Sequence, residues 1–318
     1  MKHLFNISVY NSKEDMAQAR SLIGKEGSGV DGLELLTGYD SVDTSLKSDT
    51  TSVHLPYATD WYGPATGVVS VSPDIDPMYL RFHHYGSDRA GIVESIRKAI
   101  VCAEPLDPMY GVIHASSADM SSLLSKRTTY TDEKVLTTFA DIMNEVVSTF
   151  PDGEPPFTLA FENTWWPGLR LVDDVGFGIL EDSIEFDDWG ICLDTGHILV
   201  SSGGSDDEKG ALDILNSCAD GYGDDLFDRL IAMHLHVNTS ARIMANMEEI
   251  DSTGMSFNDI IIKASERIAS VDQHRPFTDP AVVEYVERLE PEFIVHEIIT
   301  RDMVDHIRSH VCQASFFR

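Results

Sequence analysis

The 318-residue chain has few cysteines and no long apolar run, and each absence excludes a class of protein. Its four cysteines, Cys102, Cys192, Cys218 and Cys312, are scattered and form no CxxC pair. A disulfide framework or a zinc ribbon needs closer spacing, so we expect reduced thiols in a cytoplasmic protein. No apolar run approaches the roughly 18 residues of a membrane span, and the first residues are too polar for a signal peptide. We therefore expect no membrane partner.

Positive charge is also scarce. The sequence has 23 lysines and arginines against 53 aspartates and glutamates, a formal net charge of -30. A protein that binds duplex nucleic acid needs a basic surface to displace phosphate counterions. The composition therefore predicts no long nucleic acid as a partner, and it indicates an acidic, well-solvated surface.

No glycine-rich phosphate loop follows the first expected strand, which disfavours a doubly wound open sheet. No internal repeat, low-complexity tract or linker divides the chain. Short apolar segments alternate with helical patterns instead, as is typical of buried parallel strands. Strands are expected at 5–10, 32–36, 51–55, 110–115, 157–164, 189–193, 230–237 and 293–299. Helices are expected at 13–23, 88–102, 132–150 and 301–310. This alternation predicts the α/β class and a single (β/α)8 TIM barrel over residues 1–318.

Two long segments interrupt the alternation after expected strands. Segment 56–87 is rich in aromatic rings and lies on the active face, where it is either a lid over a substrate or a hydrophobic cluster that pins the loop. Trp165 leaves the same choice between substrate contact and packing. Residues 240–270 read as an insertion that contains a helical run at 257–268.

Six of the expected strands end in side chains that commonly bind metal. The C-terminal ends of parallel barrel strands converge on one site, so these side chains should meet. Alternation along each strand predicts that six of them point inward: His54, His114, Glu162, Asp194, His236 and Glu297. His197 follows Asp194 in the expected loop and can turn back over the same pocket, whereas His234 is expected one layer deeper.

So many imidazoles and carboxylates in one pocket require a compensating cation. Oxygen and nitrogen ligands without thiolate suit zinc, manganese, iron or cobalt.

These segments resemble motifs of the xylose isomerase-like TIM-barrel superfamily, also called AP endonuclease family 2, which includes endonuclease IV and ketose epimerases. Residues 162–164 resemble its ENT strand, and residues 192–197 are similar to its C-x-D-T-x-H segment. Residues 236–240 resemble H-L-N-D-S, and residues 272–275 resemble D-R-H. Thr239 stands where the family has aspartate, and the connection from His236 to Asp272 is longer than in the endonuclease.

The resemblance implies one to three divalent metal ions per chain, with zinc or manganese favoured over iron or cobalt. One ion would be held by His54, His114 and Glu162, a second by Glu162, Asp194, His236 and Glu297, and a third by His197, Asp272 and His274. Asp272 and His274 are alternatively ordinary polar residues of a loop. The epimerase branch is implied to use only the second set, with Glu162 and Glu297 as an acid-base pair.

The full ligand set favours a multi-metal hydrolase of a small phosphoester or phosphodiester metabolite, because clustered cations polarise a phosphoryl oxygen and generate hydroxide. The alternative is a sugar or sugar-phosphate isomerase or epimerase that uses one metal and the Glu162/Glu297 pair. A barrel that only binds a metabolite is a third reading. Arg242 and Arg275 are candidates for binding a phosphate, with plain exposed arginines as the alternative. Glu34 is expected either to contact substrate or to cap the next loop.

Overall fold

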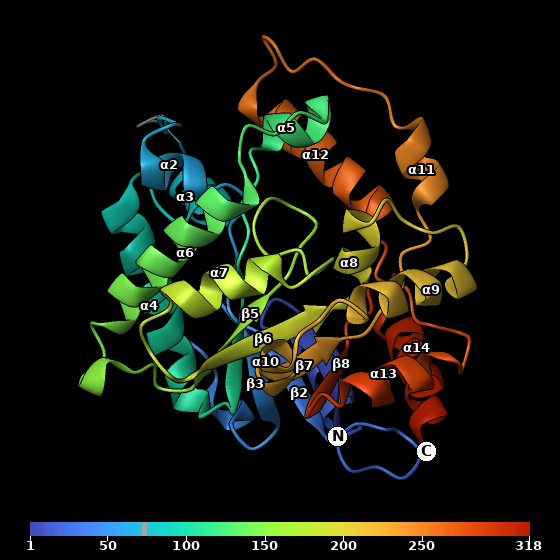
Figure 1. Cartoon of the computed structure of the whole chain (residues 1–318). Coiled ribbons are helices and arrows are strands. Elements are labelled where there is room, and N and C mark those ends of the chain that lie inside the picture. Colours follow the sequence, from blue (N-terminus) through green and yellow to red (C-terminus); the bar gives the residue numbers. More distant parts are fainter. Residues whose placement is uncertain (72–74) are drawn as a thin grey trace.

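The chain folds into a closed barrel of eight parallel strands, in the order β1 to β8, with each strand paired to its neighbours in sequence and β1 closing on β8 (Figure 1). This computed structural model describes residues 1–71 and 75–318. The strands are β1 Lys2–Ser8, β2 Gly32–Leu36, β3 Thr50–His54, β4 Tyr110–His114, β5 Thr158–Glu162, β6 Trp189–Asp194, β7 Leu230–His234 and β8 Phe293–His296. The predicted (β/α)8 fold is confirmed.

Helices surround the barrel because their apolar faces pack on the outward side chains of the strands. They are α1 Lys13–Arg20, α2 Tyr62–Thr66, α3 Pro77–His84, α4 Arg89–Ala103, α5 Met120–Ser125, α6 Asp132–Val147, α7 Val175–Ser183, α8 Thr195–Ser201, α9 Glu208–Ala219, α10 Asp224–Asp228, α11 Ala241–Asn246, α12 Phe257–Val271, α13 Val282–Leu289 and α14 Met303–Ala314. None of the helices in the described part of the chain has the length and apolar character to cross a membrane.

The interior of the barrel is filled by side chains that point inward from the strands. This inner cluster mixes large and small residues: Leu4, Tyr110, Val112, Ala160, Cys192, Ala232, Phe293 and Val295. The small side chains of Ala160 and Ala232 leave room for the rings of Tyr110 and Phe293. The centroids of these two rings lie 5.1 Å apart. Since this apolar cluster fills the barrel interior, polar side chains gather at the C-terminal ends of the strands.

Segment 56–87 is not one long loop, as the sequence suggested, because it contains α2 and α3. Asp76 caps α3 by accepting from the Met78 amide, and Pro77 occupies the first helical turn, a combination that favours a helix start. Residues 72–74 of this proposed lid lie outside the described residues.

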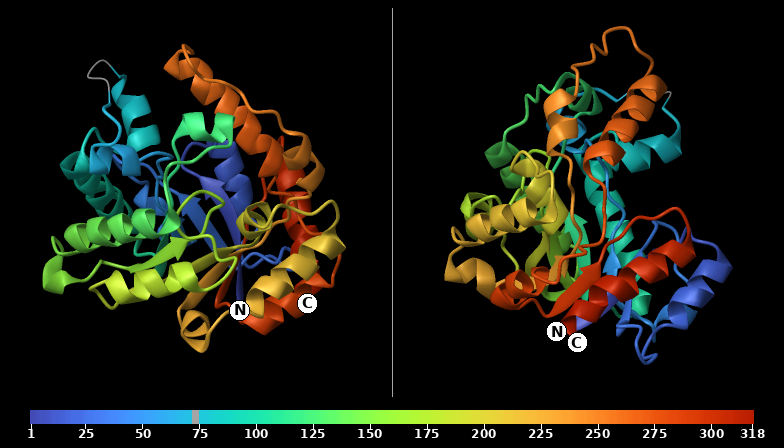
Figure 2. Two further views of the ribbon diagram at one scale, coloured as in Figure 1. Left: turned by 45° about the horizontal axis from the view of Figure 1, so that its top comes forward. Right: turned by 90° about the vertical axis from the view of Figure 1, so that its right-hand side faces the viewer.

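The insertion at 240–270 forms α11 and α12, and α12 packs on α5. Arg267 joins these parts, since its Nη1 atom donates to the carbonyls of Leu123 at 2.8 Å and Leu124 at 2.6 Å. Figure 2 shows from two further sides that α5 and α12 lie at the end of the barrel away from both termini. This is the end at which the strands finish.

Candidate metal centre

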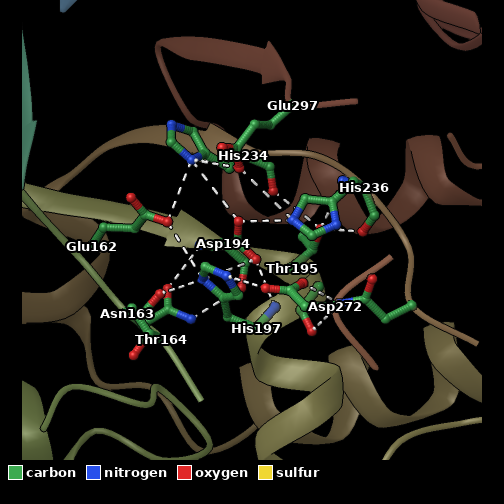
Figure 3. A network of polar contacts seen from close by, with 12 residues as sticks. Glu162, Asn163, Thr164, Asp194, Thr195, His197, His234, His236, Asp272 and Glu297 are labelled. Carbon is green, nitrogen blue, oxygen red and sulfur yellow. Dashed lines mark hydrogen bonds and ion pairs between the residues drawn. The ribbon is translucent and has the colours of Figure 1, made fainter. Parts of the chain in front are cut away.

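Glu162, the last residue of β5, points toward Asp194 and His234 (Figure 3) and takes part in two of the possible ligand groups. Its Oε2 atom is 3.1 Å from His54 Nε2 and 3.2 Å from His114 Nε2. These two histidines end β3 and β4, the two strands that precede β5, and His114 is paired in register with Glu162. The three residues offer ligand atoms that all lie within 4.8 Å of one another. The structure therefore brings the first expected ligand set together.

A second group joins the ends of four strands and contains Glu162, Asp194, His234 and Glu297. His234 Nδ1 lies 3.1 Å from Glu297 Oε2, 3.5 Å from Glu162 Oε1 and 3.9 Å from Asp194 Oδ2. From the sequence, His236 was expected in this set and His234 one layer deeper. The structure brings His234 into the group, because β7 ends at His234, which is paired in register with Asp194, while the expected ligand role of His236 stays a prediction. His236 lies beyond the end of β7, so the alternation of side chains along a strand does not apply to it.

His236 lies two residues beyond the end of β7, and its side chain lies beside the second group. Its Nε2 atom is 2.9 Å from Asp194 Oδ2 and 3.9 Å from Glu297 Oε2, and its ring stacks on that of His274 with centroids 3.9 Å apart. His236, His274 and Glu297 form a further possible ligand group. Gly196 allows this approach, because a Cβ atom there would lie 2.0 Å from His236 Cε1.

The third expected set, His197, Asp272 and His274, is also assembled. His197 Nε2 is 3.0 Å from Asp272 Oδ2, and His274 Nε2 is 3.4 Å from Asp272 Oδ1. His197 does not lie in a loop, since α8 begins directly after β6. Asp194 caps this helix, and its Oδ1 atom accepts from the His197 amide at 2.6 Å.

The long insertion does not separate Asp272 from the site, because α12 ends at Val271 and returns the chain to the barrel. Asn238 then holds the segment in place. Its Oδ1 atom accepts from the amides of Gln273 at 2.6 Å and His274 at 3.1 Å, and its Nδ2 atom donates to Asp272 Oδ1 at 2.9 Å. Asp272 and His274 are therefore not ordinary loop residues.

The hydrogen bonds show how the imidazoles are oriented. His54 Nδ1 lies 2.8 Å from the Leu55 carbonyl, and His197 Nδ1 lies 2.8 Å from the Asn163 carbonyl. A carbonyl only accepts, so Nδ1 carries a proton in each ring, and in a neutral ring the Nε2 lone pair would face a carboxylate oxygen, 3.1 Å away for His54 and 3.0 Å for His197. Two facing acceptors require a proton or a cation between them. An oxygen and nitrogen donor set of this kind fits a divalent ion such as zinc or manganese.

The electrostatics of the buried carboxylates favour their ionised forms. Burial opposes ionisation of Glu162, but the nearby His114 and His234 outweigh it and hold the pKa of Glu162 well below its usual range. Glu297 is buried as well, and His234 and His274 hold its pKa well below the ordinary value. Ionised carboxylates are the form that binds a cation.

Four further residues singled out in the sequence lie outside these groups. Arg242 is 82% exposed and pairs loosely with Asp206, while Arg275 is exposed and donates to Thr239. Trp165 is half-buried and packs edge-on against Trp166. Glu34 is only 2% exposed and accepts from Ser52 and Tyr110, and its expected contact with a substrate or role as a loop cap stays a prediction. Over residues 1–71 and 75–318, no lysine or arginine forms an ion pair with a carboxylate of the ligand groups.

Two residues that shape the site, Tyr57 and Asn163, were not among the expected site residues. Tyr57 stacks on His114 with ring centroids 4.5 Å apart and lies edge-on to His54. Desolvation of the phenol, with Glu297 and Glu162 nearby, raises the pKa of Tyr57 even though the residue as a whole is 40% exposed, so the phenol keeps its proton. Asn163 holds Asp194 through two backbone hydrogen bonds, of 2.7 and 3.0 Å. Asn163 lies in a recognisable motif, and Tyr57 lies in the aromatic segment 56–87 expected on the active face, where no pattern distinguishes it from the other rings.

No family model and no curated protein sequence matches the chain. Solved structures do match its fold. A D-tagatose 3-epimerase-like protein is 17% identical with a TM-score of 0.54, over 100% of this chain and 97% of that chain. An L-ribulose 3-epimerase is 12% identical with a TM-score of 0.56, over 99% and 92%. Endonuclease IV from Thermus thermophilus is 14% identical with a TM-score of 0.49, over 100% and 99%. At these identities the likeness concerns the fold.

Proposed function

We propose that the protein is a metal-dependent hydrolase that cleaves a small phosphoester or phosphodiester with the help of two or three divalent ions. One observation carries the proposal: the described residues hold four possible ligand groups at the end of the barrel where the strands finish, and two of them exceed the needs of a single-metal isomerase. These are the group of His54, His114 and Glu162 and the group of His197, Asp272 and His274.

The residues of the site have distinct tasks in such a reaction. Bound divalent ions would polarise the phosphoryl oxygen and activate water near neutral pH. Glu162 can bridge two positions, because its Oε2 atom faces His54 and His114 while its Oε1 atom faces His234. Tyr57 is protonated at the rim of the site and can donate a hydrogen bond to the substrate.

A small substrate fits the charge of the protein and the position of the site. The net charge of -30 disfavours a long polyanion, and α5 and α12 lie over the end of the barrel where the strands finish. Since Arg242 and Arg275 are exposed and engaged elsewhere, the ions themselves would bind the phosphoryl group.

The second candidate function is a sugar or sugar-phosphate isomerase or epimerase. The absence of lysine and arginine from ion pairs with the ligand carboxylates, throughout the described residues, suits an uncharged polyhydroxy substrate. Glu162 Oε1 and Glu297 Oε2 lie 3.5 and 3.1 Å from His234 Nδ1, and the two carboxylates could act as the acid-base pair.

The test compares a His54→Ala/His114→Ala variant with the wild type and with His83→Ala, a control histidine on α3 outside the ligand groups. We expect the double variant to lose about one metal equivalent and to hydrolyse a chromogenic phosphodiester about a thousandfold more slowly. Ketose isomerisation should fall far less. A metal-loaded wild type that isomerises ketoses but cleaves no phosphoester would refute the hydrolase and leave the second candidate.

A further inference from the structure

Glu34 is a buried carboxylate inside the barrel, beneath the metal centre, that the reaction itself does not use. It projects from β2 and is 2% exposed. Its Oε2 atom accepts from Ser52 Oγ at 2.9 Å and from the Tyr110 hydroxyl at 3.4 Å. Its Oε1 atom lies 2.9 Å from His234 Nε2. Glu34 therefore connects β2 with β3, β4 and β7.

Burial of this carboxylate is unfavourable unless each oxygen has a partner. The two hydroxyl groups serve Oε2, so His234 is the partner that remains for Oε1. No lysine or arginine pairs with Glu34 anywhere in the described residues. The interaction with His234 is consequently the strongest polar contact available to Glu34.

The same contact determines which nitrogen of His234 faces the centre. His234 Nε2 lies 2.9 Å from Glu34 Oε1, within ion-pair distance but without hydrogen-bond geometry, and because a carboxylate only accepts, the charge of Glu34 favours the ring form with the proton on Nε2. The Nδ1 atom of a neutral ring then has a free lone pair. That atom lies among three carboxylate oxygens, 3.1 Å from Glu297, 3.5 Å from Glu162 and 3.9 Å from Asp194. This arrangement matches a nitrogen ligand that completes an oxygen-rich cation site.

We propose that Glu34 is a positioning residue: it fixes the tautomer and the ring orientation of His234, so that Nδ1 is presented to the ion shared by Glu162, Asp194 and Glu297. A carboxylate behind a ligand histidine also makes the imidazole a stronger ligand. This inference rests on the metal centre of the proposed function, and it does not depend on which reaction the centre catalyses.

Glu34→Gln tests the proposal because it keeps the shape of the side chain and removes its charge. We expect zinc and manganese to bind one site about 10- to 100-fold more weakly, measured by competition with a chromogenic chelator. The visible spectrum of the cobalt-loaded protein should change as well. Ser52→Ala is the matched control, because it removes a neutral hydrogen bond to the same carboxylate and leaves the contact with His234 intact.

A folded Glu34→Gln with wild-type affinity and spectrum would overturn the inference, and so would an equal loss in Ser52→Ala. If Glu34→Gln does not fold, Glu34→Asp keeps the charge and withdraws it by one methylene, and the same weakening is expected. A wild type that binds no divalent ion would refute both this inference and the proposed function. Weaker binding in Glu34→Gln, from a wild type that hydrolyses nothing, would support the inference and refute the hydrolase alone.

Discussion

His310 should make the stability of the fold sensitive to acid. It lies on α14, fully buried against Phe5, with its Nε2 atom donating to the Gly29 carbonyl at 2.9 Å and its Nδ1 atom without a partner. Burial lowers the pKa of His310 from 6.5 to about 3. The hydrogen bond to Gly29 acts in the opposite direction and raises this pKa, while the neighbouring His306 lowers it further. The folded protein thus holds a neutral ring where the unfolded chain takes up a proton.

The sign of the effect follows from the lowered pKa. The stabilisation is complete above pH 6.5 and is lost as the pH falls toward the folded value, because only the unfolded state gains the proton in that range. One pKa unit corresponds to about 1.4 kcal/mol, so at about pH 5 the loss is about 2 kcal/mol.

His310→Gln removes the titrating group and can still donate to Gly29. We expect urea unfolding to show that the stability difference between this variant and the wild type shifts by about 2 kcal/mol in favour of the variant from about pH 7.5 to about pH 5. Arg308→Gln, an exposed change on the same helix, should show no such shift. A difference for His310→Gln that is the same at both pH values would refute the reasoning.

Three further predictions concern the site and the surface charge. Glu162→Gln should lose most bound metal and activity, because a neutral amide cannot bridge two cations; elemental analysis showing wild-type metal content would contradict the centre. Binding to an abasic DNA duplex should be undetectable at physiological salt, and a salt-sensitive, tight complex in a gel-shift titration would restore a DNA-repair function. With a net charge of -30, the urea midpoint should rise between low salt and about 1 M salt, where the Debye length shrinks to about 3 Å; a falling midpoint would argue against repulsion among surface carboxylates.

The strand pattern and its end residues could be read from the sequence because they obey local rules. Side chains alternate along a strand, and parallel strands of a barrel finish at one face. Those rules predicted the eight strands and the convergence of His54, His114, Glu162, Asp194 and Glu297, which the structure places together.

Other features depend on contacts between distant parts of the chain. The choice between His234 and His236 depends on where β7 ends, which is decided by its pairing with β6 and β8. Glu34 has its place beneath the centre only because the closed barrel brings β2 opposite β7. The position of Tyr57 on His114 likewise follows from the path of the loop after β3. Sequence spacing does not predict these contacts between distant residues. The distances between their side chains are set by closure of the barrel and not by local periodicity.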